Sequence, residues 1–313
     1  MSAELRTARH VILLGCGSSY NAALYGAAFM KQLCNFVTVE AIDASELQPS
    51  DLPKTHERIA VILISQSGET KDLHRCLALL RNTTTLTIGI VNVVDSLIAR
   101  DVDCGVYCNS GTEVGVASTK SFTSQVVCLS LVALWFAQNQ DTNKSLRASV
   151  IKSLRNLSND YVRTLTQINS QAKVLSETIV KDAKSMFILG KGCDKYIADE
   201  SALKIKEISY IHTESYSASS LKHGPFALLD AQFPVIIINS EEEHDDKITS
   251  CYQEIKARDS PQILITTQKP NTETDADTDV SRATMIVPKN KHYGSLLALI
   301  PLQLISYYLS INK

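Results

Sequence analysis

Apolar residues along this chain gather in short unbroken runs, and segments of mixed polarity separate the runs. One run, residues 59–64, contains only Ile, Ala, Val and Leu and ends in the polar segment 65–70. A short run of this kind predicts a strand buried on both faces, as in a parallel sheet. The segment that follows, residues 71–80, has the apolar spacing of a helix. We therefore expect residues 65–70 to lie where a buried strand leads into a helix N-terminus.

The chain repeats this arrangement at an offset of 175 residues. Three apolar runs in register at one offset indicate two copies of one α/β unit. The matching segments are Gly15-Cys16-Gly17 with Gly190-Lys191-Gly192, 59–64 with 234–239, and 87–92 with 262–267.

Helical spacing follows the glycines of both copies, over residues 19–33 and 195–211. Each copy therefore reads β–α–β–α–β and then a further strand and helix. Alternating strands and helices predict an α/β fold with parallel sheets that carry helices on both faces. We expect three segments: a first unit at 1–145, connecting helices at 146–175 and a second unit at 176–313.

The composition is that of a soluble globular protein, with 44% hydrophobic and 20% charged residues. The 31 basic and 33 acidic residues nearly cancel, which argues against a nucleic-acid partner. The longest apolar stretch, residues 126–137, is too short to span a bilayer, and residues 1–10 lack a signal sequence. Eight scattered cysteines favour a reducing, cytoplasmic location. We read Cys104 and Cys108 as strand residues and expect no metal site.

The polar segment after the run 59–64 is the candidate anion site. A helix N-terminus offers backbone N–H groups and the positive end of the helix dipole, which suit a phosphate. Four neutral side chains there could hold a phosphate monoester: Ser65, Gln66, Ser67 and Thr70. The alternative is an ordinary helix cap, because Ser and Thr are common capping residues. Both interpretations remain open at the level of sequence.

The glycine motif after the first strand suggests a ligand other than a dinucleotide. Gly15 and Gly17 lack the third glycine of the nicotinamide-binding fingerprint. They do allow Ser18 and Ser19 to approach a ligand closely. In the second copy, the segment that corresponds to 65–69 is acidic, with three consecutive glutamates at 241–243. We interpret this run as a solvated loop that repels phosphate, so only the first copy can bind an anion in this way.

Reactive side chains are concentrated in the second copy. Glu200, Lys204 and Glu207 share one face of a predicted helix, and spacing alone favours a solvated face with ordinary ion pairs. His223 stands in a Gly- and Pro-containing loop beside Lys222, which would lower its proton affinity. It is either an acid/base group or a surface residue.

A further candidate lies in the first copy. Residues 113–120 contain a glycine turn before a long apolar helix. We expect Ser118 and Thr119 to cap this helix.

Five motifs occur in one order along the chain, and together they resemble a known family. They are Gly-Cys-Gly-Ser-Ser, Ser-Gln-Ser-Gly-Glu-Thr, Glu-Val-Gly-Val-Ala-Ser-Thr-Lys, Ala-Leu-Lys-Ile-Lys-Glu-Ile-Ser-Tyr and Leu-Lys-His-Gly-Pro. This series closely resembles the isomerase half of the glutamine–fructose-6-phosphate aminotransferases, which consists of two sugar-isomerase (SIS) domains. The resemblance extends from about residue 8 to about residue 310.

The resemblance implies a hexose 6-phosphate ligand, roles for individual residues and no cofactor. Glu207 matches the base that moves a proton between C1 and C2, and Lys204 matches its neighbour. His223 matches the group that opens the sugar ring, which in the family arrives from the second subunit of a homodimer. The matching phosphate-binding positions are Ser18, Ser19, Ser65, Gln66, Ser67, Thr70, Val116 and Ser118.

The chain differs from the family pattern at both ends. The family's glutaminase domain has no counterpart here, so a glutaminase or a full-length aminotransferase is a possible partner. The family's tail lysine forms a Schiff base with the open sugar, and we do not assign that role to Lys313. We therefore expect a preserved sugar-phosphate site with impaired catalysis.

Three functions are consistent with these patterns. The first is a cytoplasmic isomerase module that converts fructose 6-phosphate for amino-sugar synthesis with ammonia. The alternative is a non-catalytic sugar-phosphate-binding protein or regulator. A deaminase of glucosamine 6-phosphate fits the Lys-His-Gly-Pro region less well.

Overall fold

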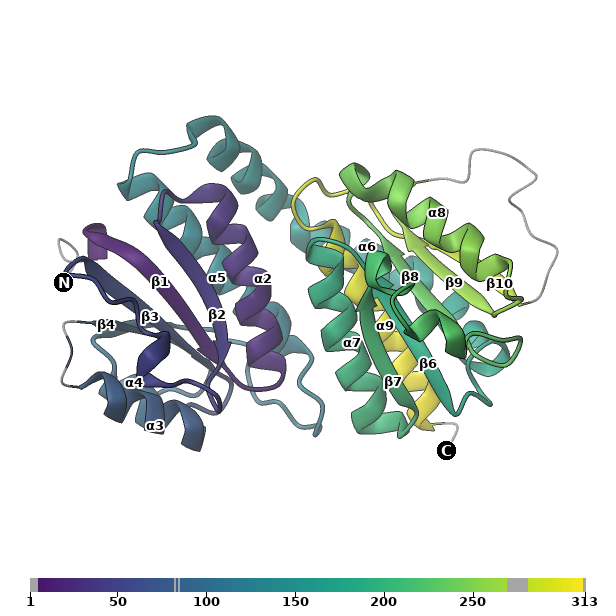
Figure 1. Ribbon diagram of the computed structural model, residues 1–313, viewed down its shortest axis with the longest axis horizontal. Helices are drawn as coiled ribbons and strands as arrows, with labels where there is room; N and C mark the ends of the chain where they lie inside the picture. Colours follow the sequence, from purple (N-terminus) through teal and green to yellow (C-terminus); the bar gives the residue numbers. More distant parts are fainter. Residues whose placement is uncertain (1–4, 82, 84, 269–280, 312–313) are drawn as a thin grey trace. The chain divides into compact units, whose positions relative to one another are not determined.

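The computed structural model describes residues 5–81, 83, 85–268 and 281–311. The chain forms two compact units, Met1–Ser149 and Val150–Lys313 (Figure 1). The boundary falls inside the predicted connecting segment, and the three-part division remains a prediction.

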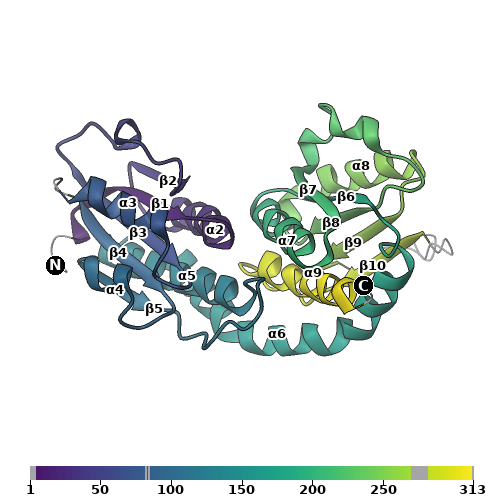
Figure 2. The same cartoon turned by 90° about the horizontal axis from the view of Figure 1, so that it is seen from below.

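The first unit is built on a parallel sheet of five strands in the order β2-β1-β3-β4-β5. Helices α3 and α4 pack on one face of this sheet through a cluster of buried aliphatic side chains, and α2 and α5 contact each other on the other face (Figure 2). The elements are β1 Ala8–Gly15, α2 Ser18–Leu33, β2 Thr38–Asp43, the 3₁₀ turn η1 Pro49–Asp51, β3 Arg58–Ser65, α3 Lys71–Leu80, β4 Leu86–Val91, α4 Leu97–Asp101, β5 Cys104–Tyr107 and α5 Lys120–Asn139.

The second unit repeats this design. Its parallel sheet has the order β10-β9-β8-β6-β7, so in both sheets the first strand lies between the second and the third. Helix α8 packs on one face and α9 covers the other, where it contacts α7 (Figure 2). The elements are α6 Lys144–Thr178, β6 Ser185–Gly190, α7 Cys193–Ser209, β7 His212–Ser217, the 3₁₀ turns η2 Ala218–Ser220 and η3 Pro225–Leu228, β8 Val235–Asn239, the 3₁₀ turn η4 Glu242–His244, α8 Asp245–Lys256, β9 Gln262–Thr266, β10 Arg282–Ile286 and α9 Gly294–Ile311.

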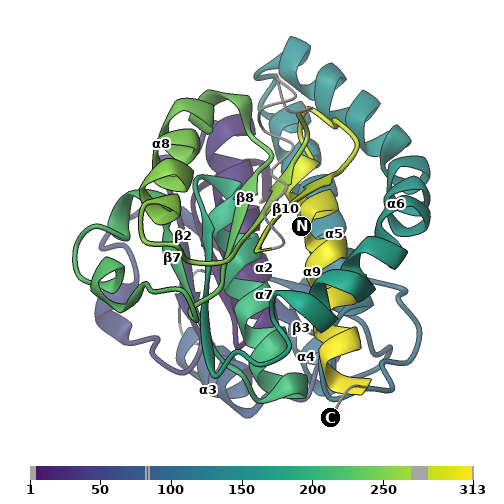
Figure 3. The ribbon, with the colours of Figure 1, turned by 90° about the vertical axis from the view of Figure 1, so that its right-hand side faces the viewer.

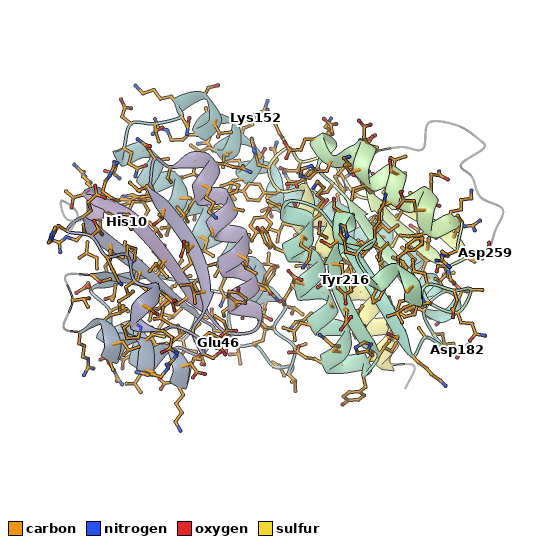
Figure 4. The ribbon with its side chains drawn as sticks, in the orientation of Figure 1. His10, Glu46, Lys152, Asp182, Tyr216 and Asp259 are labelled. Atoms are coloured by element: carbon orange, nitrogen blue, oxygen red, sulfur yellow. The ribbon has the colours of Figure 1, made fainter. Side chains whose placement is uncertain are left out.

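The α/β fold with helices on both faces of parallel sheets is confirmed, and so is the helix at 71–80, which is α3. The structure contains one strand in each unit that the expected series β–α–β–α–β did not include. These strands, β2 and β7, are sheet edges with mixed polar sequences and no long apolar run. His10 (Figure 4) lies on β1 and is buried. Its Nδ1 lies 2.9 Å from Thr38 Oγ1 of β2, a polar link that apolar patterning does not detect.

The connecting segment is one helix, α6, and not several. Residues 144–178 contain neither Gly nor Pro, so nothing in the sequence breaks the helix.

Two helices, α5 and α9, are long and apolar enough to cross a membrane by length and composition alone. Both are core helices of their units, with 50% and 67% of their apolar windows buried. The expectation that 126–137 is too short a stretch therefore understated α5, which has 20 residues.

The strand order creates a switch point in each sheet. From β1 the chain turns to β2 on one side, while β3 lies on the other side. In parallel α/β sheets, ligands bind where the strand order reverses, outside the carboxyl ends of the strands. Gly15 keeps this edge tight, because a Cβ there would lie 2.5 Å from the carbonyl carbon of Ser19. The first unit thus places 15–19 and 65–70 at neighbouring strand ends.

Gly68→Ala tests how tightly this edge is packed. Gly68 has φ +68°, and an added Cβ would lie 1.9 Å from Ser96 Oγ. We expect the variant to lose about 1–3 kcal/mol more unfolding free energy than Gly111→Ala, because of overpacking. Gly111 has φ +69°, and nothing lies within 4 Å of an added Cβ. Its substitution therefore carries the same backbone strain but no steric clash. Urea unfolding of both variants measures the difference, and equal losses would contradict the tight packing.

Candidate functional site

The segment 65–70 forms a compact loop held by its own hydroxyls. Ser65 is 2% exposed, and its Oγ accepts a hydrogen bond from the backbone N–H of Gly68 at 3.0 Å. The same Oγ lies 2.9 Å from Thr70 Oγ1. Ser67 Oγ accepts from the N–H of Glu69 at 3.1 Å. The loop therefore presents neutral hydroxyls at the N-terminus of α3.

Thr70 occupies the N-cap position of α3, but its side chain makes no capping hydrogen bond. The hydroxyl pairs with Ser65 instead. Of the two interpretations that the sequence left open, the ordinary cap is therefore absent. An N-terminus without a side-chain cap keeps the character of an anion-binding end.

The neighbouring helix, α2, begins in the same way. Its N-cap is Gly17, with φ 56°, and it has no side-chain cap. Ser19 is buried, and its Oγ accepts a hydrogen bond from Gln125 Nε2 of α5 at 3.0 Å. Ser18 is half-buried in the first turn of α2. Two helix N-termini thus meet the ends of two adjacent strands, β1 and β3.

The loop before α5 differs from expectation. Thr119 is the N-cap residue and makes no side-chain cap. Glu113 takes that role, since its carboxylate accepts from the Ser121 N–H at 3.0 Å and from Thr119 Oγ1 at 3.2 Å. Burial raises the pKa of Glu113, hydrogen bonds from Ser121 and Thr119 lower it, and the net shift is downward. The capping prediction for Ser118 and Thr119 was wrong because a carboxylate suits the helix dipole better.

Two predicted binding residues lie in this loop, and neither is buried. Val116 is 91% exposed and Ser118 is half-buried. Neither position lines the cavity beside the loop 65–70.

A cavity of about 450 Å³ lies beside that loop. Gln66 is the predicted binding residue that lines it. Its amide-rich wall is ordered, because Asn92 donates to the carbonyl of Gly111 and accepts from Ser110, both at 2.8 Å. The lining residues are Gln66, Asn92, Val93, Asn109, Gly111 and Thr112. Amides and carbonyls without a charged lining residue suit a ligand rich in hydroxyl groups.

At the equivalent switch point, the second unit carries its own carboxylates. Glu241 Oε2 accepts from the Cys193 N–H at 3.1 Å, at the start of α7. Asp194 is buried and accepts from the Ser240 N–H at 2.8 Å. The reading of 241–243 as a solvated loop was therefore wrong for Glu241, although Glu242 and Glu243 are exposed. Carboxyl groups of the chain itself thus stand at this switch point, where the first unit offers neutral hydroxyls.

Burial controls the charge of these two acids. It raises the pKa of Asp194 to about 6, although hydrogen bonds from Ser240 oppose the shift. It raises the pKa of Glu241 to about 7, and the negative charge of Asp194 adds to the effect. Both carboxyls therefore change protonation within the range in which proteins are usually studied.

The α7 cluster is largely buried. The solvated face that spacing alone had favoured was therefore wrong. Glu200 is 0% and Lys204 2% exposed. Lys204 Nζ lies 2.6 Å from Glu207 Oε2 and 3.6 Å from Glu200 Oε1. A buried ammonium needs such partners. Glu207 alone retains a substantially exposed side chain, at 28%, so it is the member of this cluster that can meet a ligand.

His223 is exposed in the turn between η2 and η3. Its neighbour Lys222 forms an ion pair with Glu254 of α8 at 2.7 Å, and this pair raises the pKa of Lys222. The charge of Lys222 is therefore partnered by Glu254, and its expected effect on His223 stays a prediction.

Glu207 and His223 lie on opposite sides of the second sheet. Helix α7 packs with α9, whereas η2 packs with α8, where Cys251 Sγ donates to the carbonyl of Ala218. The second unit by itself does not bring these two side chains together.

Sequence reasoning missed Asp194 and Gln125. Both are buried polar residues whose partners, Ser240 and Ser19, are 46 and 106 positions away. An aspartate next to a Gly-x-Gly turn could have signalled the first. No sequence pattern signals the second.

Within the described ranges, no group of three or more His, Cys, Asp or Glu side chains could hold a metal ion. Cys104 begins β5 and Cys108 follows it, close to the predicted strand positions. Lys313 lies outside the described residues.

Comparison with known proteins gives consistent similarities. The family model of the SIS domain matches residues 4–135 and 179–313. A probable glutamine–fructose-6-phosphate aminotransferase from Acanthamoeba polyphaga mimivirus is 40% identical over 97% of this chain and 48% of its own length. The Saccharomyces cerevisiae aminotransferase is 36% identical over 99% of this chain and 43% of its length. The chain thus spans about half the length of these curated relatives.

A solved structure covers the same region. The C-terminal domain of glucosamine-fructose-6-phosphate aminotransferase from Francisella tularensis aligns with a TM-score of 0.89 and 30% identity, over 99% of this chain and 86% of that one.

Glu241→Gln tests the effect of burial on the Glu241 carboxyl. The folded-state pKa is raised, so the contribution of this group to stability is fully present below its unfolded pKa, near 4, and is lost as the pH rises through about 7. At pH 8 we expect the unfolding free energy of the variant, measured by urea titration, to exceed that of the wild type by about 1–3 kcal/mol. At pH 4 the two proteins should match. Glu243→Gln, on an exposed neighbour, is the control, and an equal gain in both variants would contradict a specific cost of burying the Glu241 carboxylate.

Proposed function

We propose that this chain, which belongs to the SIS-domain family, is a sugar-phosphate isomerase module acting on fructose 6-phosphate in amino-sugar synthesis. The similarity to aminotransferases over nearly the whole chain supports the reaction class. The substrate and the activity of this chain are part of the proposal.

One contrast between the two switch points supports phosphate binding most strongly. In the first unit, neutral hydroxyls of Ser65 and Thr70 stand at an N-terminus without a side-chain cap. In the second unit, the corresponding loop supplies the carboxylate of Glu241, which accepts from the Cys193 N–H at the start of α7, the counterpart of α2. The hydroxyls at the start of α3 carry no charge of their own, and a phosphate is an anion that suits such a helix N-terminus.

We assign the phosphate to six side chains of the first unit and the sugar hydroxyls to the cavity lined by Gln66 and Asn92. Val116 and Ser118, from the loop before α5, complete the binding set. The six side chains are Ser18, Ser19, Ser65, Gln66, Ser67 and Thr70.

The second unit would supply proton transfer. Glu207 is proposed to move the proton between C1 and C2, as a carboxylate base. Lys204 fixes one oxygen of that carboxylate at 2.6 Å, so the base approaches the sugar in a defined position. Both Lys204 and Glu200 are buried, which keeps this pair away from solvent.

His223 is proposed to open the sugar ring, since an imidazole can shuttle protons near neutral pH. Its position across the sheet from Glu207 favours a homodimer in which the second copy supplies the histidine. A glutaminase or a full-length aminotransferase is the proposed source of ammonia, and the cytoplasm the proposed compartment.

The exposure of His223 supports one alternative. A chain whose ring-opening group faces solvent could bind sugar phosphates without turning them over. The two experiments below separate binding from catalysis.

The double variant Ser65→Ala/Thr70→Ala tests the phosphate loop. We expect its affinity for fructose 6-phosphate to fall about 10- to 100-fold, because each hydroxyl donates to a charged group. Isothermal titration measures the affinity. Thr83→Ala, outside the loop, should bind like the wild type. Unchanged affinity in the double variant would remove the basis for this site.

Glu207→Gln tests proton transfer. A coupled assay for glucose 6-phosphate, with fructose 6-phosphate as substrate, should show a rate about 10²- to 10⁴-fold lower than that of the wild type. Affinity for fructose 6-phosphate should remain, and Glu214→Gln, on β7, should keep full activity. A wild-type rate no higher than that of Glu207→Gln would favour the non-catalytic alternative.

A further inference from the structure

Helix α5 carries a buried amide side chain among apolar neighbours. Gln125 is 1% exposed, and Phe122 and Val126 beside it in the helix are fully buried. Its Oε1 is buried without a hydrogen-bond partner among the described residues. An unpaired buried oxygen costs free energy that an apolar side chain of similar size would avoid. Packing alone therefore does not account for an amide at this position.

The amide nitrogen of Gln125 contacts the start of α2. Nε2 donates to Ser19 Oγ at 3.0 Å, and this hydrogen bond joins residues 106 positions apart. An amide nitrogen can only donate, so the serine oxygen is the acceptor. The hydroxyl of Ser19 has a single proton, and because Oγ accepts from Gln125, that proton is left for another partner. The bond thus makes Ser19 a hydrogen-bond donor at the first turn of α2.

The N-terminus of α2 is open on the side of Gly17. A Cβ added at Gly17 would have nothing within 4 Å. The offset of 175 places Gly17 on Gly192, before α7, where an added Cβ would lie 2.1 Å from Glu241 Oε2. The same point is therefore open in the first unit and filled by a carboxylate in the second.

The counterpart of Ser19 indicates where an anion would lie. The offset of 175 places Ser19 on Asp194 and Ser65 on Ser240. The buried Asp194 carboxylate accepts from the N–H of Ser240 at 2.8 Å and from its hydroxyl. In the second unit, negative charge thus lies between the start of α7 and the loop that matches residues 65–70. The matching place in the first unit is beside the hydroxyl of Ser19.

In both units the paired helix supplies a donor to this position. Helix α2 packs against α5 (Figure 2), and α7 packs against α9 (Figure 3). Ser295 of α9 donates to the Asp194 carboxylate, as Gln125 of α5 donates to Ser19. The donor is thus common to both copies, although its acceptor is charged in one copy and neutral in the other.

We infer that Gln125 is a positioning residue of the phosphate site, an inference that rests on the proposed function. Its amide holds the Ser19 hydroxyl so that the proton is donated to a phosphate oxygen. Gln125 is too buried to meet the ligand and acts through Ser19. Without the amide, the hydroxyl is no longer fixed before the ligand arrives, and ordering it reduces the affinity.

Gln125→Met tests this role, because Met has a similar length and no donor. The affinity of the full chain for fructose 6-phosphate, measured by isothermal titration, should fall about 3- to 10-fold. In the coupled assay KM should rise by the same factor while kcat stays within about twofold, since ground-state and transition-state binding are lost equally. Ser130→Ala is the control: it removes a buried hydroxyl of the same helix, bonded to the carbonyl of Val126, and should bind like the wild type. Unchanged affinity in Gln125→Met would overturn the inference.

The combination with Ser19→Ala separates positioning from structural support. If the amide acts through Ser19, Gln125→Met should weaken binding by less than about a further twofold in the Ser19→Ala background. If Gln125 only supports the packing of α2 on α5, the loss would be the same in both backgrounds, and the inference would be wrong. Urea unfolding confirms that each variant titrated is folded.

Gln125→Glu tests the direction of the hydrogen bond. A carboxylate accepts the proton of Ser19 and adds a negative charge near the ligand, so the loss of affinity should exceed that of Gln125→Met. A smaller loss would contradict the assigned donor.

Inorganic phosphate is the second probe, and Gln125→Met should weaken its binding by a similar factor. A wild type that binds phosphate but not fructose 6-phosphate would overturn the proposed substrate, and the phosphate affinities would then decide the inference. A wild type that binds neither ligand would overturn both.

Discussion

The helix N-terminus at the carboxyl edge of a parallel sheet is the constraint on which this structure depends. Its first backbone N–H groups have no partner within the helix, and the aligned peptide dipoles favour a negative charge beside them. The two units meet this demand differently. The second unit supplies a carboxylate from its own chain, Glu241, whereas the first unit supplies hydroxyls without charge. The same local physics thus produces a closed end in one copy and, as we propose, an anion-binding end in the other.

This difference explains how a duplicated fold can divide one task. Carboxylates of the chain at the switch point repel a phosphate there. The reactive groups of such a unit lie on other surfaces. In the second unit those surfaces carry Lys204 and Glu207, held by a buried ion pair, and the exposed His223. We propose that the first unit binds and the second converts, which keeps strong phosphate binding separate from proton transfer.

Covering the sheet edge is a second constraint that the two copies meet differently. Helix α6 buries the outer side of β10 and α9, and the corresponding residues of β5 and α5 remain exposed. Leu131 and Trp135 are large apolar side chains of the kind usually found in protein interiors, but here they are exposed.

The sequence by itself determined the α/β class, the main strands and α3, because apolar runs and helical spacing report burial directly. It also located the loop from Ser65 to Thr70. It could not determine the edge strands β2 and β7, whose polar residues are stabilised by distant partners such as the pair His10–Thr38. Only the tertiary structure decided that Lys204 is buried, that Glu113 caps α5 and that Glu241 turns inward, because each depends on groups that meet only when the chain has folded.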